Sequence, residues 1–75
     1  MTLPVAEEEF RKLKFMLVNL GGDSFNNMTP LNAESMIKSS GLESVIKEQQ
    51  LNKLMDIKKL FGDDILERIN ASINN

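Results

Sequence analysis

The sequence predicts an all-α fold, a compact four-helix bundle. Three observations support this class. Apolar residues recur at steps of three and four over several stretches, as they do along one helical face. No run alternates apolar and polar residues as a half-buried strand would. Residues typical of turns gather between the periodic stretches, and a length of 75 residues suits a single domain over residues 1–75.

A first helix is predicted over residues 4–20. Its apolar residues recur at helical spacing: Ala6, Phe10, Leu13, Leu17 and Leu20. Gly21 and Gly22 end the pattern. Three further apolar residues widen the face: Phe15, Met16 and Val18. This width predicts that the helix contacts more than one neighbour and is the central packing element.

A loop and a short helix are predicted next. Residues 21–29 are dense in Gly, Asn, Asp and Ser, and we expect Phe25 and Met28 to anchor this loop in the core. A second helix is predicted over residues 30–39. Thr29 would cap it, and Pro30 suits its first position, where a missing N–H costs nothing.

The remaining chain predicts a third helix over residues 42–49 and a fourth over residues 51–73. Residues 47–50 contain nothing apolar, so we place a bend there. Apolar residues keep helical spacing on both sides of Gly62. Either the helix breaks at this glycine or a neighbouring backbone approaches it closely, and we favour close approach.

The composition argues against an enzyme. The chain has no His, Cys, Tyr or Trp, which removes most nucleophiles and general bases. It also lacks a phosphate-binding loop motif. Asp63, Asp64 and Glu67 could be imagined as metal ligands, but three carboxylates in a helical turn are more often a solvated face. We therefore expect a non-enzymatic binding module with no cofactor, no metal and no small-molecule substrate.

Charge is unevenly distributed along the chain. The formal net charge is -2, yet residues 11–59 hold eight Lys or Arg against five Asp or Glu, a formal +3. The acidic total argues against tight, indiscriminate phosphate binding, so any nucleic-acid binding should be weak. The opening residues lack the basic start of a signal peptide, and no apolar run approaches the roughly 20 residues that span a membrane. We expect a cytoplasmic protein without a membrane partner.

The lysines and phenylalanines have simple interpretations on their own. Lysines beside an apolar stripe usually keep a helix face wet, and that is the plainer interpretation of Lys53, Lys58 and Lys59. All four phenylalanines fall where a core would place them. No exposed platform for stacking bases is therefore expected.

A family resemblance adds a function. The segment KKLFGDDILERI, residues 58–69, resembles the closing stretch of the HRDC domain, the helicase-and-RNase-D C-terminal module. The residues in matching order are Phe61, Gly62, Asp63, Asp64, Ile65, Leu66 and Ile69. FRKLKFMLVNLGG and MTPLNAESMIKSS resemble the opening of the family. The chain departs from the family at KEQQLN, residues 47–52, where members commonly carry a glycine-containing turn.

The resemblance implies a helical bundle of the kind appended to RecQ-type helicases and RNase D. It implies an accessory role in DNA recombination and repair, through weak, sequence-independent phosphate contacts to single-stranded or branched DNA. The residues available for these contacts are Arg11, Lys12, Lys14, Lys38, Lys53, Lys58 and Lys59. The alternative is a protein-interaction module that docks on a helicase or recombinase through an apolar groove. A self-associating adaptor would instead show a large exposed apolar patch.

Overall fold

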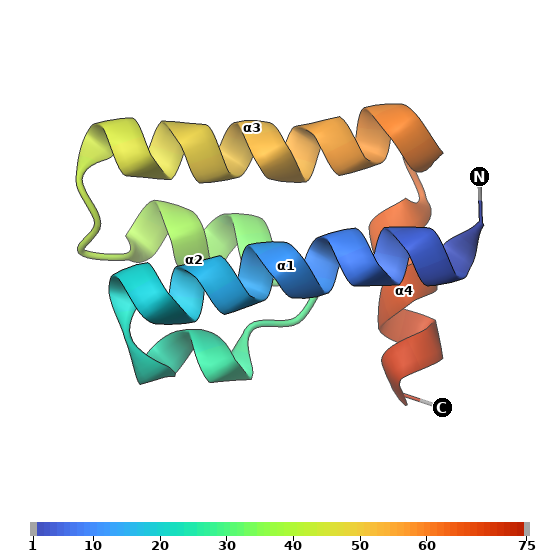
Figure 1. Cartoon of the computed structure of the whole chain (residues 1–75), viewed down its shortest axis with the longest axis horizontal. Coiled ribbons are helices and arrows are strands. Elements are labelled where there is room, and N and C mark those ends of the chain that lie inside the picture. Colours follow the sequence, from blue (N-terminus) through green and yellow to red (C-terminus); the bar gives the residue numbers. More distant parts are fainter. Residues whose placement is uncertain (1, 75) are drawn as a thin grey trace.

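The computed structural model describes residues 2–74, with side chains for residues 2–73. Within that range the chain forms four α-helices and one 3-10 helix, and no strand (Figure 1). Their bounds are α1, Leu3–Gly21; η1, Asp23–Asn27; α2, Ala33–Ser39; α3, Ser44–Phe61; and α4, Ile65–Asn74. The all-α four-helix bundle predicted from the sequence is confirmed. The boundary between the third and fourth helices lies at residues 62–64, where the sequence predicted it near residue 50.

α1 is the central packing element, as predicted. It contacts η1, α3 and α4, and it runs antiparallel to α3 while α4 passes across the end of the pair (Figure 1). Its buried residues are Ala6, Phe10, Leu13 and Leu17. Leu20 was expected on the same face but is 47% exposed, and it lines a hollow shared with residues of η1 and α2. Gly22, with a φ of 98°, then ends α1.

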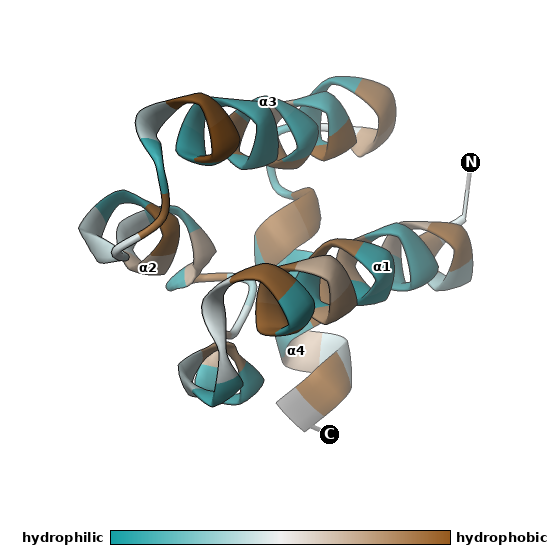
Figure 2. Cartoon of the chain, turned by 60° about the vertical axis from the view of Figure 1, so that its left-hand side comes forward, coloured by the Kyte–Doolittle hydropathy of each residue, from teal (hydrophilic) through white to brown (hydrophobic). Residues whose placement is uncertain are grey.

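One cluster of apolar side chains joins all the elements. Figure 2 shows that each α-helix is hydrophobic along part of its circumference and hydrophilic along the rest. The buried members are Ala6, Phe10, Leu13, Leu17, Phe25, Met28, Ala33, Ile37, Leu54, Ile57, Ile65 and Ile69. Phe25 and Met28 are each 2% exposed, so the predicted anchoring of the loop is confirmed. Each large side chain of this kind contributes about 1.5–3 kcal/mol on burial.

α2 begins at Ala33, three residues later than predicted. Thr29 and Asn32 hold a turn before the helix instead. The Thr29 backbone N–H donates to Asn32 Oδ1 at 2.7 Å, and the Asn32 N–H donates to Thr29 Oγ1 at 3.2 Å. Thr29 therefore closes a turn rather than capping a helix, and Pro30 lies buried within that turn.

The bend predicted at residues 47–50 is wrong, because α3 is continuous from Ser44 to Phe61. Lys, Glu and Gln are good helix formers, so a polar run does not interrupt a helix. Gln50 occupies the core position that an apolar residue would fill and is 2% exposed. Its Nε2 reaches only Met16 Sδ, at 4.0 Å, and its Oε1 accepts no hydrogen bond from residues 2–73.

The helix breaks at Gly62, where close approach of a neighbour was favoured. Gly62 has φ 110° and ψ 156°, a conformation essentially reserved for glycine. A Cβ placed here would meet only Asp64 Oδ1, at 3.4 Å, so no neighbouring backbone requires the glycine. Its N–H donates to Lys58 O at 2.8 Å and closes α3. The chain then turns through residues 62–64 into α4.

Substituting Gly62 tests this break. We expect Gly62→Ala to lower the free energy of unfolding by about 1–3 kcal/mol, since a Cβ disfavours the observed backbone. Gly41→Ala is the matched control, because Gly41 has open space around it and no positive φ; its effect should stay within about 0.5 kcal/mol. Urea unfolding followed by circular dichroism measures both, and equal stabilities would contradict the assignment.

Gln50 provides a second test of the packing. Gln50→Met should raise the free energy of unfolding by about 1 kcal/mol. It replaces a buried amide, whose oxygen accepts no hydrogen bond from residues 2–73, with an apolar chain of similar length. Gln49 is exposed, so Gln49→Met should change stability by less than about 0.5 kcal/mol. A loss of stability in Gln50→Met, measured by thermal unfolding, would show that the amide contributes to the seam between α1 and α3.

Candidate nucleic-acid interface

The seven predicted site residues do not form one continuous surface. Arg11, Lys12 and Lys14 line a hollow on α1. Lys38, Lys58 and Lys59 line a groove formed by α2, α3 and α4. Lys53 belongs to neither: it lies five residues before Lys58, which places it about 140° away around α3. The structure thus separates the set into two surfaces and one isolated lysine.

The hollow lies along the solvent side of α1 and has a volume of about 570 Å³. Its lining residues are Glu8, Arg11, Lys12, Lys14, Phe15, Val18 and Asn26. Asn26 comes from η1 and the others from α1. Three cationic side chains and one carboxylate line it. Glu7 and Glu9, which pair with Arg11 and Lys12, bring these cations and the carboxylates that engage them to a formal charge of zero. The hollow therefore gathers cations that a phosphate can reach only in competition with glutamates.

Glutamates from the preceding helical turn engage two of these cations. Arg11 Nη1 lies 2.6 Å from Glu8 Oε2, and Arg11 Nη2 lies 3.7 Å from Glu7 Oε2. Lys12 Nζ lies 3.6 Å from Glu9 Oε1. Exposed pairs of this kind contribute about 0–1 kcal/mol, so a phosphate can compete for these cations, although the glutamates stay nearby and oppose its charge. Lys14 forms no ion pair with any residue the structure describes.

Phe15 lies on the surface, although its position in the sequence was expected to be in the core. It is 69% exposed, so the expectation that all four phenylalanines lie in the core is wrong. It lies two residues from both Leu13 and Leu17, which are buried. Two residues correspond to about 200° around a helix, so Phe15 points away from the core. That spacing was the signal in the sequence.

The groove is larger and differs in character. It has a volume of about 1010 Å³. It is lined by Pro30, Leu31, Glu34, Ser35, Lys38, Ser39, Leu51, Leu54, Met55, Lys58, Lys59, Asp63, Leu66 and Glu67. Three cations face three carboxylates, so its formal charge is zero. Leu31 and Met55, 60% and 52% exposed, supply apolar surface to it.

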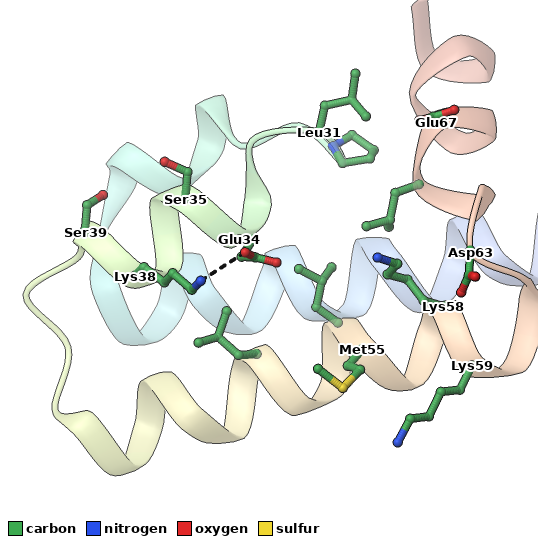
Figure 3. A pocket seen from close by; sticks show the side chains of 14 residues that line it. Leu31, Glu34, Ser35, Lys38, Ser39, Met55, Lys58, Lys59, Asp63 and Glu67 are labelled. Carbon is green, nitrogen blue, oxygen red and sulfur yellow. Dashed lines mark hydrogen bonds and ion pairs between the residues drawn. The ribbon is translucent and has the colours of Figure 1, made fainter.

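Within the groove, one lysine is paired and two are not. Lys38 Nζ lies 3.0 Å from Glu34 Oε2, one turn away on α2 (Figure 3). Lys58 and Lys59 form no ion pair within residues 2–73. Figure 3 shows Lys58 extending into the space between the helices and Lys59 extending away from it. Asp63 and Glu67 approach from the α4 side.

Lys53 and Lys47 have structural contacts instead. Lys53 Nζ lies 3.5 Å from Met16 Sδ, across the seam between α3 and α1. Lys47 Nζ donates to the backbone oxygen of Lys38 at 2.9 Å, which joins the first turn of α3 to the last turn of α2. A cation at the carboxyl end of a helix is favourable. Lys47 was not among the predicted site residues, and this contact gives it a role in packing.

The described part of the chain shows neither a metal-binding cluster nor a membrane-spanning helix. Across residues 2–73, no three His, Cys, Asp or Glu side chains are grouped so that they could hold a metal ion. None of the described helices combines the length and apolarity needed to cross a membrane.

No family model, no curated protein and no solved structure matches the chain.

Proposed function

We propose that this chain is a non-enzymatic helical module that binds nucleic acid weakly, without reading its sequence, in support of DNA recombination and repair. The observation that carries the proposal is the gathering of three cationic side chains in the α1 hollow, one of which, Lys14, has no ion pair among residues 2–73. Arg11, Lys12 and Lys14 would neutralise backbone phosphates there. The groove lysines, Lys58 and Lys59, would add to the attraction at longer range.

The chemistry of the hollow supports weak rather than tight binding. Three cations imply at most about three phosphate contacts, and single-stranded DNA releases about 0.7 counterion per contact. Arg11 and Lys12 must also exchange a glutamate for a phosphate. Contacts from these cations to phosphates would position the strand without specifying its sequence.

The resemblance to the HRDC domain supports the same function. The residues that carry it, Phe61 to Ile69, form the end of α3, the turn at Gly62 and the start of α4. This segment positions α4 against α1 and α3. The other resembling segment, FRKLKFMLVNLGG at residues 10–22, contains Arg11, Lys12 and Lys14, so the resemblance covers both the scaffold and the hollow on α1.

Salt dependence of binding tests the proposal. The slope of log affinity against log salt is negative. Arg11→Gln/Lys14→Gln should make it shallower by about 1.4, because two contacts are lost at about 0.7 each. Fluorescence anisotropy with a labelled oligothymidylate at several salt concentrations gives the slope. Circular dichroism of the variant checks that the bundle is intact.

Lys58→Gln/Lys59→Gln is the matched control, because it removes the same charge from the groove. Its slope should change by less than that of the α1 pair. Equal changes in both pairs would extend the contact surface to the groove. An unchanged slope in both pairs would contradict phosphate binding by these residues.

A second candidate function is favoured by the groove. Its zero formal charge and its apolar residues, Leu31, Leu51, Leu54, Met55 and Leu66, suit an amphipathic helix of a protein partner better than they suit DNA. By the resemblance, that partner would be a helicase or recombinase. Acidic residues on the edge of the incoming helix would complement Lys58 and Lys59.

Met55 separates this candidate from DNA binding. If the groove holds a helix, that helix would bury Met55. Met55→Ser should then weaken binding of amphipathic helices selected from a displayed library by about tenfold, since it removes this apolar contact without changing the charge. Isothermal titration calorimetry measures the affinity. Oligothymidylate affinity should remain within about twofold in the same variant. Peptide affinities unaffected by Met55→Ser would exclude this groove as the docking site.

A further inference from the structure

We infer that the ring of Phe15 is a stacking platform for an unpaired nucleobase, so that the hollow prefers single-stranded nucleic acid to duplex. This inference rests on the proposed function and names the form of nucleic acid that the site takes. It follows from the position of the ring, the side chains around it and the small apolar area near it.

The ring is exposed, and the backbone that carries it is held in place. Phe15 is 69% exposed, on the side of α1 opposite the core. Leu13 and Leu17, on either side of it in sequence, are 4% and 0% exposed. Their burial fixes the backbone that carries the ring, so little order must be gained when a base stacks on it.

The side chains beside the ring suit a nucleotide strand. Arg11 and Lys12 precede Phe15 by four and three residues, so they are its neighbours on the helix surface. Lys14 lines the same hollow. A base can therefore stack on the ring while its flanking phosphates lie near the cations, which is the arrangement found in single-strand binding proteins. Asn26 adds an amide that can donate to or accept from a base edge.

The small extent of the apolar surface favours a base over a protein. Apart from Phe15, the only aliphatic side chain lining the hollow is Val18, and it is partly buried. A stable protein interface buries roughly 800 Å² on each partner around an apolar centre. One ring among charges falls short of that, whereas one ring is sufficient for one base. Paired bases are stacked inside a duplex and cannot reach the ring, which gives the preference for single strands.

The experiment compares two oligonucleotides that carry the same phosphates. One is oligothymidylate and the other is an abasic strand of equal length, both labelled for anisotropy at low salt. We expect the protein to bind oligothymidylate about tenfold more tightly than the abasic strand, and Phe15→Ala to reduce that ratio to about one. The affinity of the protein for a thymidylate–adenylate duplex of the same length should be unchanged in Phe15→Ala.

Leu60→Ala is the matched control, because Leu60 is 59% exposed on α3 and lines neither surface. Leu60→Ala should keep the tenfold ratio of the two affinities. If that ratio depended on exposed apolar area in general, Leu60→Ala would lower it as Phe15→Ala does. The chain has no tryptophan, so Phe15→Trp adds a single reporter at the site. Its fluorescence should be quenched by oligothymidylate and not by the abasic strand.

The outcomes separate the inference from the function on which it rests. Equal affinity of the protein for both strands, or an unchanged ratio in Phe15→Ala, would overturn stacking while leaving phosphate binding in place. Absence of binding to both strands at low salt would overturn the proposed function and the inference together.

Discussion

The fold depends on burying one face of α1. Ala6, Phe10, Leu13 and Leu17 are all at most 4% exposed, and the helix that carries them contacts η1, α3 and α4. A chain of this size buries only about 60% of the surface that its unfolded form exposes. In so small a core, one helix face must serve several neighbours. Because α1 uses one face so completely, its opposite face is free to carry Phe15 and the cations beside it.

The two surfaces arise from the way the helices share neighbours. α2 packs on α3, and α4 packs on both α1 and α3, so α2 and α4 flank α3 and leave a groove between them. Lysines of α3 meet carboxylates of α4 there, and the charges balance. On α1, Glu7, Glu8 and Glu9 precede the cations along the helix and pair with Arg11 and Lys12. The two surfaces therefore differ less in formal charge than in apolar content, since the groove is lined by several aliphatic side chains and the hollow by Phe15 and Val18.

Helical periodicity was sufficient to predict the fold class, the central role of α1 and the anchoring of Phe25 and Met28. The errors have a common cause. Periodicity reports only which residues are apolar, and the structure departs from that pattern at three residues. Gln50 is polar yet fills a core position, Phe15 is apolar yet faces solvent, and Gly62 breaks a helix whose apolar spacing continues on both sides. Seven of the nine cations were predicted as site residues, but their division into two surfaces and one isolated lysine depends on tertiary packing that no local pattern contains.

The break at Gly62 also bears on association between copies of the chain. Phe61, Ile65 and Ile69 keep helical spacing across it, so a straight helix over residues 44–74 would satisfy the same pattern. Such a helix would measure about 45 Å, against a longest dimension of 32 Å for the folded chain. It would carry Ile65 and Ile69 beyond their own core and present them to the core of a second copy, as in domain swapping. The backbone at Gly62 therefore favours the closed single-chain bundle over exchange of α4 between two molecules.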